Sequence, residues 1–513
     1  MAIISDCFCK DILTILIAFT VCIYGYFKWA YQYWKRRGIP NLEPTIPFGT
    51  FANPILNPKP ISDQTMEQYN MAKAKGYKHV GLFSLVAPTY MPLDLEYIKN
   101  IMTKDFDHFM DHGFYYNEKD DPIGAHLFTS EGAKWRNLRM KLTPTFTSGK
   151  MKMMFQTLIE CGKQMSEYME EASLKEESID IKDISGCFTT DVIASCAFGI
   201  DCNSFKDRNS DFRKHLKRNF VFTISEILGS MLGFTAPNLA RKLGIRFVPK
   251  EVSDFFLRII RETVEYREKN NVVRKDFMQL LLDLKNNVLE TGGEYQHDGK
   301  SLSMDELADQ AFLFLAAGFE TSSTTMTFCL YELAINQDLQ ERVREEINSV
   351  LEQHGGRVTY DAIMKMKYMG QVVEETLRKY PPLPMLNRVC VADYKIPNTD
   401  ITLEKGTLVL IPIVGLQRDE DYFPDPERFD PERFSEENKR NIPQFSYLPF
   451  GEGPRACIGL RFGMMQVKVG LTALLQNYVF TLNNKTKTPL EMNPASISMA
   501  ALGDIWLDVK RVS

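Results

Sequence analysis

The chain has 513 residues, of which 44% are hydrophobic and 25% charged, an ordinary composition for a globular protein. Its formal net charge of -5 gives no reason to expect nucleic acid as a partner. The ten cysteines form neither the short-spaced framework of small secreted domains nor a CxxC zinc pair. Most of them are therefore expected to be reduced, buried and inert.

The N-terminal segment predicts a membrane anchor over residues 1–34. Residues 12–34 contain one charge, Lys28, and are aromatic at their C-terminal end. As a helix they would measure about 34 Å, enough to cross a bilayer with the aromatic side chains as an interfacial belt. Three basic residues follow directly: Lys35, Arg36 and Arg37. The positive-inside rule then places the rest of the chain in the cytosol. The alternatives are a buried helix and a cleaved signal peptide, but no A-x-A-like cleavage site is present.

The rest of the chain is expected to be a proline- and glycine-rich linker over 35–50 and one large domain over 51–513. Apolar residues at helical spacing predict helices over 150–171, 210–228, 250–269, 276–285, 304–337 and 339–353. Strand-like runs are few and short: 78–82, 407–414 and 479–482. The fold class is therefore expected to be mainly α with a small β-sheet region.

The segment Phe450-Gly-Glu-Gly-Pro-Arg-Ala-Cys-Ile-Gly459 surrounds one cysteine with glycines. Glycines allow backbone N–H groups to turn towards a sulfur atom. A helix is predicted over 460–475, so Cys457 lies at a helix N-terminus, where the helix dipole favours the thiolate. Arg455 can bind an anionic group. The pattern predicts a thiolate ligand.

Two other interpretations fit this loop less well. Residues 451–456 match the loose dinucleotide pattern G-x-G-x-x-A, which requires a preceding strand and an acid about twenty residues later. The preceding segment 443–449 begins and ends with proline, and no acid lies near Gln476. The other interpretation is a buried structural cysteine. In that case the match at five positions, Phe450, Gly453, Arg455, Cys457 and Gly459, would be a coincidence expected in about one chain in 10⁴.

Five further segments combine residues in a motif-like way. In Ala317-Gly-Phe-Glu-Thr321, small residues leave room for a ligand, and the Thr321 hydroxyl can bond to the carbonyl of Ala317. Glu375-Thr-Leu-Arg378 places opposite charges at i, i+3, and on an exposed helix such an ion pair adds little stability. The others are Trp135-Arg-Asn-Leu-Arg139, Pro384-Met-Leu-Asn-Arg388 and Pro431-Glu-Arg-Phe434.

In their order and spacing these segments resemble the cytochrome P450 family of haem-thiolate monooxygenases, in its membrane-bound eukaryotic form. The detail is most similar to the branch of insect and vertebrate xenobiotic-metabolising enzymes. The resemblance covers essentially the whole chain and implies haem b (iron protoporphyrin IX) with Cys457 as the thiolate ligand of the iron. The other haem-contacting residues that it implies are Arg455, Trp135, Arg139, Arg388, Phe450, Gly451, Gly459 and Ala317.

The resemblance also implies a proton-relay pair, Glu320 and Thr321. A buried structural network under the haem would join three residues: Glu375, Arg378 and Arg433. Arg433 is preferred to Arg428 because the family pattern FxPERF fits residues 429–434. One departure is that many relatives read His-x-Asp-Pro after Leu416, where this chain has Gln417-Arg-Asp-Glu420; this region is structural in the family.

A pocket for a lipophilic substrate is expected beside Ala317 and Thr321. By resemblance its walls include Phe106, Phe109, Phe114, Tyr115, Phe128, Phe312, Met385, Ile497 and Met499. The region 215–240 is apolar enough to form a lid that touches the membrane.

The resemblance implies insertion of one oxygen atom from O2 into a lipophilic xenobiotic, hormone or lipid. Electrons would come from NADPH through NADPH–cytochrome P450 reductase, with cytochrome b5 as a further candidate donor, at the endoplasmic reticulum membrane. The basic residues Lys134, Arg136 and Lys141 would receive the acidic donor. Two alternatives remain. One is a reductase-independent haem-thiolate isomerase or peroxide rearrangement enzyme, a class that commonly lacks the relay pair. The other is a non-catalytic haem carrier.

Overall fold

The computed structural model describes residues 2–286 and 301–512. The helices are α1 (Ala2–Ala30), α2 (Tyr33–Arg36), α3 (Ile61–Ala74), α4 (Leu95–Lys99), α5 (Gly132–Leu142), α6 (Ser148–Leu174), α7 (Ile181–Phe198), α8 (Asp211–Arg218), α9 (Ile224–Thr235), α10 (Pro237–Lys242), α11 (Lys250–Asn270), α12 (Phe277–Lys285), α13 (Met304–Ile335), α14 (Gln337–Glu352), α15 (Tyr360–Lys365), α16 (Lys367–Lys379), α17 (Ile413–Gln417) and α18 (Leu460–Leu475). The strands are β1 (His79–Ser84), β2 (Ala87–Pro92), β3 (Ile179–Asp180), β4 (Leu386–Val389), β5 (Tyr394–Lys395), β6 (Thr402–Leu403), β7 (Leu408–Ile411), β8 (Tyr478–Leu482) and β9 (Trp506–Arg511). The mainly helical fold expected from the sequence is confirmed.

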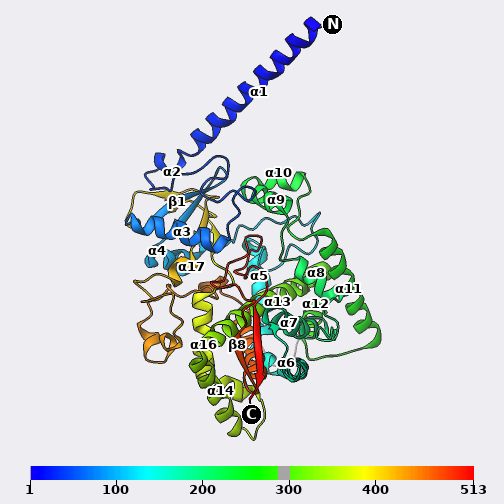
Figure 1. The fold of residues 1–513 in the computed structure, drawn as a ribbon. Helices are drawn as coiled ribbons and strands as arrows, with labels where there is room; N and C mark the ends of the chain where they lie inside the picture. The colour runs from blue at the N-terminus through cyan, green and yellow to red at the C-terminus, as the bar shows by residue number, and fades with distance from the viewer. Residues whose placement is uncertain (1, 287–300, 513) are drawn as a thin grey trace.

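The strands form three small sheets. The first has the order β1-β2-β7-β4, with β2 parallel to β7 and the other neighbours antiparallel. The second has the order β3-β9-β8, and β5 pairs with β6. In Figure 1 the first sheet lies near the start of the domain, beside α3, whereas β8 lies among the helices at the C-terminal end.

Helix α13 crosses the domain and packs against α7 on one side and α18 on another. The approach to α7 is close because residue 318 is glycine: a Cβ there would collide with the side chain of Ile193. On the other side, Gln466 of α18 donates a hydrogen bond to the carbonyl of Gly318 at 3.3 Å. Residues 317–321 therefore lie where three helices meet.

The predicted helix over 210–228 is wrong, because the chain forms two helices, α8 and α9, with a break at residues 219–223. The break is caused by a capping box: the Thr223 side chain accepts a hydrogen bond from the Glu226 N–H, and the Glu226 carboxylate accepts one from the Thr223 N–H. Such a box starts a new helix. The pattern was visible in the sequence as Thr-x-x-Glu.

The end of the N-terminal segment differs from the expected belt and linker. Helix α1 is exposed over most of its length, and residues 10–30 are long and apolar enough to cross a membrane. Trp34, however, is 1% exposed and donates from Nε1 to the carbonyl of Leu82 at 2.8 Å. Residues 39 and 42 are also buried, and the Leu42 N–H donates to the carbonyl of Gly81. Packing against β1 satisfies these polar groups, so residues 31, 34, 39 and 42 are part of the core around the first sheet.

We expect Trp34→Ala to lower the free energy of unfolding by about 3–5 kcal/mol, the usual cost of truncating a buried aromatic side chain. Trp29→Ala is the control, since Trp29 is 61% exposed and its replacement should change stability by about 0.5 kcal/mol or less. Urea unfolding of the two variants in detergent measures both values. Equal effects would contradict the packing described for Trp34.

Candidate active site

Cys457 lies on a short loop between Phe450 and α18. Its N–H donates to the carbonyl of Phe450 at 2.8 Å. Gly451 and Gly453 have φ of 68° and 73°, and a Cβ at Gly453 would collide with the carbonyl oxygen of Met102. Only glycine fits that position without strain. The loop is thus fixed in shape before any ligand is considered.

The start of α18 provides hydrogen-bond donors to the Cys457 sulfur. Burial raises the pKa of the Cys457 thiol, while the N–H groups of Gly459 and Leu460 and the charge of Arg139 lower it. Cys457 keeps exposed surface, although desolvation of its sulfur is the largest of these effects and the net pKa is raised. The Cys187 thiol is buried as a whole residue, and desolvation raises its pKa to about 12. Cys457 therefore has what a thiolate ligand needs, which is accessibility and donors aimed at sulfur.

Arg455 is buried beside this loop. Its guanidinium donates to three main-chain carbonyl groups at 2.8–3.2 Å, those of Met110, Leu127 and Ser130. It lies 3.5 Å from a carboxylate oxygen of Asp111 and 4.1 Å from the ring centroid of Trp135. Burial, followed by the charge of Arg388, lowers the pKa of Arg455 to about 9. Trp135 of α5 thus supports this guanidinium by stacking.

Arg388, on β4, is 1% exposed, yet within the described residues its side chain makes one hydrogen bond, to the carbonyl of its neighbour Asn387 at 2.7 Å. Among the described residues, Arg388 Nε has no hydrogen-bond partner, and the Arg388 guanidinium forms no ion pair. Burial lowers its pKa to about 10. Burial and the charges of Arg388 and Arg455 also lower the pKa of His112 well below its usual value. A buried guanidinium without a carboxylate is costly unless an anion binds it.

The segment with the expected relay pair lies in the middle of α13. The Thr321 hydroxyl donates to the carbonyl of Ala317 at 2.8 Å, as the sequence predicted. The Glu320 carboxylate accepts a hydrogen bond from the Ser498 hydroxyl at 2.8 Å. Burial raises the pKa of Glu320, and the hydrogen bond from Ser498 lowers it. A buried, hydrogen-bonded carboxyl with a raised pKa holds its proton more readily than an exposed one and can take part in proton transfer.

Glu375 and Arg378, on α16, form a fully buried pair. Arg378 Nε and Nη2 donate to the two Glu375 oxygens at 2.7 and 2.8 Å. The Asp430 N–H donates to Glu375 at 2.9 Å, and Arg433 Nε lies 3.5 Å from the same oxygen. Arg428, the alternative in the sequence, is exposed. The structure therefore brings the three predicted network residues together.

Gln417, the departure from the family pattern, connects this network to the cysteine loop. Its Nε2 donates to the carbonyls of Leu377 and Arg378 at 2.9 and 3.0 Å. Its Oε1 accepts from the Leu448 N–H at 2.9 Å. Both polar atoms of this buried side chain therefore bond to the main chain. Beyond the departure itself, no sequence pattern predicted this role.

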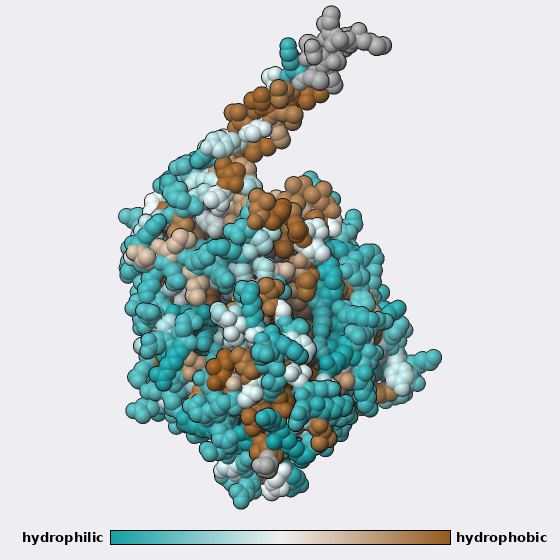
Figure 2. Space-filling model, viewed as in Figure 1, coloured by the Kyte–Doolittle hydropathy of each residue, from teal (hydrophilic) through white to brown (hydrophobic). Residues whose placement is uncertain are grey.

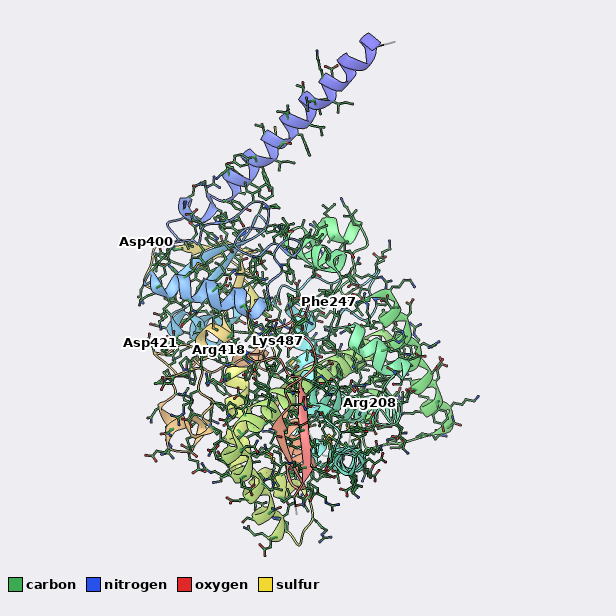
Figure 3. The ribbon with its side chains drawn as sticks, viewed as in Figure 1. Arg208, Phe247, Asp400, Arg418, Asp421 and Lys487 are labelled. Atoms are coloured by element: carbon green, nitrogen blue, oxygen red, sulfur yellow. The ribbon has the colours of Figure 1, made fainter. Side chains whose placement is uncertain are left out.

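Phe114 is the centre of an aromatic cluster beneath α9 and α10. Its ring centroid lies 4.9 Å from Phe128, 5.5 Å from Phe234 and 6.4 Å from Phe247. Phe247 lies between the α9–α10 pair and α8 in Figure 3. The Phe128 ring also lies 4.7 Å from His112, so the cluster extends from the buried arginines towards the apolar surface of α9.

The other residues expected around the substrate pack in different parts of the structure. Ile497 is 45% exposed, and Phe109 and Met385 belong to the core around the first sheet. Phe312 packs against Phe256 of α11, because it lies about 140° around the helix from Ala317. The remaining three side chains are buried in other contacts: Phe106 against Trp135, Tyr115 with its hydroxyl on the carbonyl of Ile245, and Met499 in the main core. Phe247 also takes part in the aromatic cluster and was not among the residues predicted from the sequence.

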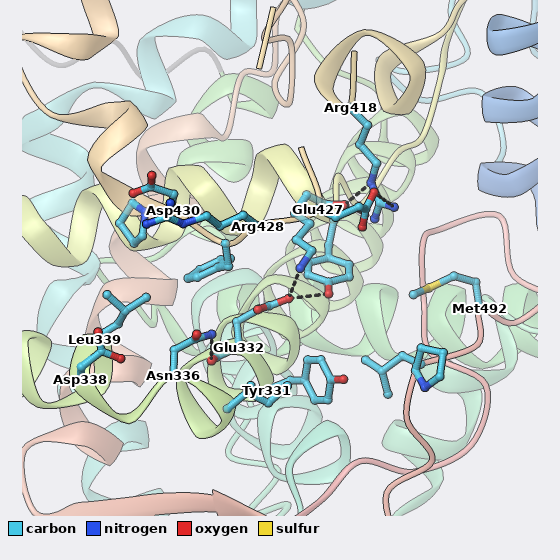
Figure 4. Close-up of a pocket in the computed structure, with 17 residues that line it drawn as sticks. Tyr331, Glu332, Asn336, Asp338, Leu339, Arg418, Glu427, Arg428, Asp430 and Met492 are labelled. Carbon is cyan, nitrogen blue, oxygen red and sulfur yellow. Dashed lines mark hydrogen bonds and ion pairs between the residues drawn. The ribbon is translucent and has the colours of Figure 1, made fainter. Parts of the chain in front are cut away.

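A cavity of about 570 Å³ lies behind the network, at the C-terminal ends of α13 and α16 (Figure 4). Glu332 accepts hydrogen bonds there from Lys379 at 2.8 Å and from the Tyr380 hydroxyl at 2.6 Å. Arg418 donates to the carbonyl of Lys379. These charged groups are already bonded to other parts of the protein. The cavity is therefore lined in part by charged and polar groups and is not the expected apolar pocket.

The cytochrome P450 family model matches residues 47–507 of this chain. The chain belongs to the cytochrome P450 family. Its similar relatives include cytochrome P450 6A1 of Musca domestica, 43% identical over 95% of both chains. Another is probable cytochrome P450 6a14 of Drosophila melanogaster, 42% identical over 94% of this chain and 96% of its own. Cytochrome P450 6k1 of Blattella germanica is 41% identical over 99% of this chain and 98% of its own. These insect relatives confirm the resemblance seen in the sequence.

Cytochrome P450 enzymes are haem-thiolate monooxygenases, and the residues of this one fit a haem. The buried Arg388 guanidinium has no carboxylate among the described residues, and a haem propionate would supply one. Arg139 and the N–H groups at the start of α18 lie close enough to lower the pKa of Cys457. When bound, a thiolate-ligated haem iron activates dioxygen.

Proposed function

We propose that this cytochrome P450 inserts one oxygen atom from O2 into a lipophilic small molecule, with electrons from NADPH delivered by NADPH–cytochrome P450 reductase. The observation that carries the proposal is the packing of α18 against α13 through Gln466 and Gly318. This contact holds the Cys457 loop and the Glu320–Thr321 pair on adjacent helices, which is the arrangement that oxygen activation followed by proton delivery requires.

In this proposal Cys457 is the haem ligand, and Glu320 and Thr321 hold and move protons. The anionic edge of the haem is held by the cationic and stacking side chains of Arg455, Arg388, Arg139 and Trp135. The small or flat residues against the ring are Phe450, Gly451, Gly459 and Ala317. Glu375, Arg378 and Arg433 keep the loop in place.

A lipophilic substrate is supported by the aromatic cluster around Phe114 and by its position below the surface of α9 and α10. Figure 2 shows an apolar patch over α9–α10 at the same end of the molecule as α1. Its exposed residues are Val221, Ile224, Leu228, Leu239 and Leu243. An apolar lid beside a membrane anchor admits molecules dissolved in the bilayer. We propose xenobiotics as the first class of compounds to screen. The catalytic domain is proposed to lie on the cytosolic side of the endoplasmic reticulum membrane.

The reductase is proposed to dock on the surface of α5. Arg136 is paired with Asp107 at 3.0 Å, but both side chains are more than half exposed. Exposed pairs are weak, so an acidic partner can replace Asp107. Cytochrome b5 is a second candidate for the same surface.

The test is turnover of lipophilic compounds by the purified protein with reductase, NADPH and O2. Hydroxylated product that depends on all three supports the proposal. Product formed from peroxides without reductase would instead indicate a rearrangement enzyme, and haem binding without product from any compound screened would indicate a carrier.

The proposed role of Arg388 predicts that Arg388→Leu loses haem faster than the wild type. Losing one hydrogen bond to a charged group should raise the rate about tenfold or more. Transfer of haem to an excess of scavenger protein measures this rate, and Arg440→Leu, at an exposed arginine, is the control. Equal rates in the two variants would contradict the assignment of Arg388 to a propionate.

A further inference from the structure

Glu320 is bonded to a part of the chain 178 residues away in sequence, the C-terminal turn that holds Ser498. The Ser498 hydroxyl donates to Glu320 Oε1 at 2.8 Å. Ser498 is 5% exposed, so water competes little for this bond. A charge-assisted hydrogen bond of this kind is among the stronger ones in proteins.

A second hydroxyl continues from the first. Ser496 Oγ lies 2.9 Å from Ser498 Oγ and accepts from the Ser498 N–H at 3.2 Å. Each hydroxyl has one proton to donate, so when Ser498 donates to Glu320, Ser496 donates to Ser498. When Glu320 is protonated, the direction of both bonds can reverse. Ser496 is buried, at 9% exposed, but its neighbour Ile497 is 45% exposed, so the row of hydroxyls runs from Glu320 into a turn that borders the solvent.

The turn that carries the two serines is fixed on several sides. The Met499 N–H donates to the carbonyl of Pro382 at 2.9 Å, and the Asn493 N–H donates to that of Ala500 at 2.8 Å. Lys182 of α7 donates to the carbonyl of Ala501 at 2.9 Å. The hydroxyls are therefore preorganised by bonds that do not involve their side chains.

The charged groups that face Glu320 come from two other helices. Burial raises the pKa of Glu320, whereas the hydrogen bond from Ser498 and the charges of Lys182 on α7 and Lys217 on α8 lower it. Lys217 is itself bound to Asp183 at 2.9 Å. Ser498 is thus the group in direct contact that stabilises the Glu320 carboxylate.

We propose that Ser498 is a positioning residue for Glu320, and that Ser496 and Ser498 form the hydroxyl chain through which Glu320 exchanges protons with the surface. This inference rests on the proposed relay role of Glu320. No redox step is involved: one proton enters at Ser496 and one leaves Ser498 for the carboxylate, so charge and atoms balance.

The first test is the titration of Glu320 in the haem-loaded, full-length protein. Infrared difference spectra between pH values report the stretch of the protonated carboxyl, assigned by its loss in Glu320→Gln. Without its hydrogen bond the carboxylate is less stable, so the midpoint in Ser498→Ala should rise by about one pH unit. Ser498→Thr keeps a hydroxyl and should return the midpoint towards that of the wild type.

The matched control is Ser178→Ala. Ser178 also donates to a carboxylate at 2.8 Å, that of Asp508, but in the C-terminal sheet. Ser178→Ala should leave the midpoint of the Glu320 titration unchanged. A midpoint in Ser498→Ala equal to that of the wild type overturns the positioning role.

The second test measures hydrogen peroxide against hydroxylated product per NADPH oxidised. The ratio should rise about tenfold in Ser498→Ala, as expected for one lost hydrogen bond to a charged group. Ser496→Ala breaks the chain but keeps the bond between Ser498 and Glu320, so the ratio should rise while the midpoint stays. An unchanged ratio in Ser496→Ala overturns the hydroxyl chain.

Glu320→Gln separates this inference from the proposal beneath it. If Glu320→Gln itself leaves the ratio unchanged, the relay role of Glu320 fails, and this inference fails with it. If Glu320→Gln raises the ratio and Ser498→Ala does not, the role of Ser498 alone is wrong.

Discussion

Replacing Cys457 by serine is expected to remove the thiolate-type Soret band from the reduced carbon monoxide complex and to reduce turnover to background. A serine hydroxyl is not ionised near neutral pH, even with the N–H groups of Gly459 and Leu460 and the charge of Arg139, which act on the sulfur. The thiolate is what gives the haem its oxygen-activating character in this family. Absorption spectra of the reduced protein with and without carbon monoxide measure the change.

The control for this experiment is Cys390→Ser. Cys390 is buried, and its Sγ lies 2.9 Å from the carbonyl of Ala392, a bond that a serine hydroxyl can also make. This variant should keep both the band and the turnover. A thiolate-type band that survives in Cys457→Ser, or that is lost in Cys390→Ser, would show that Cys457 has been wrongly assigned.

The second large effect is expected for Arg378→Ala, which should lower the free energy of unfolding by about 3–5 kcal/mol. Arg378 and Glu375 are both fully buried, so the variant leaves a carboxylate without its ion-pair partner. It also removes the donors to three main-chain carbonyls, those of Gln417, Pro426 and Arg428. Urea unfolding and haem content report the loss.

Two comparisons make that prediction specific. Lys487, labelled in Figure 3, forms an exposed ion pair with Glu491. Lys487→Ala breaks this pair and should lower the free energy of unfolding by about 0.5 kcal/mol or less. Glu375→Leu combined with Arg378→Leu should recover part of the stability lost in Arg378→Ala, because no charge remains buried, but not the part due to the carbonyls. A double variant as unstable as Arg378→Ala would contradict the ion-pair argument.

The long amphipathic helices could be predicted from the sequence because one face is apolar and the other polar. Helix α11 was expected over 250–269 and extends over Lys250–Asn270. Helix α7 was missed because it is buried on almost every side. It therefore has no polar face, and its sequence shows no helical alternation of polar and apolar residues. Strand β9 was missed because it is defined by its pairing with β8 and β3, which lie far away in sequence.

The candidate site could be predicted where it depends on local spacing. The bond from Thr321 to Ala317 joins i and i+4 on one helix, and the bond from Arg378 to Glu375 joins i and i+3. The bond from Ser498 to Glu320 has no local signal, because tertiary packing alone brings these segments together. The packing of the expected substrate-wall residues has no local signal either: Phe109 and Phe114 are close in sequence but belong to different clusters.

The burial of Trp34 has a mechanical consequence. Only a few residues separate the end of α1 from a side chain locked against β1, and Glu404 accepts a hydrogen bond from Tyr33 at 3.0 Å and pairs with Arg37. If α1 spans a membrane as proposed, it is coupled rigidly to the domain, and a change in its tilt is expected to rotate the catalytic domain with it. The thickness of the bilayer, which sets that tilt, would then set how deeply the apolar patch of α9–α10 enters the lipid.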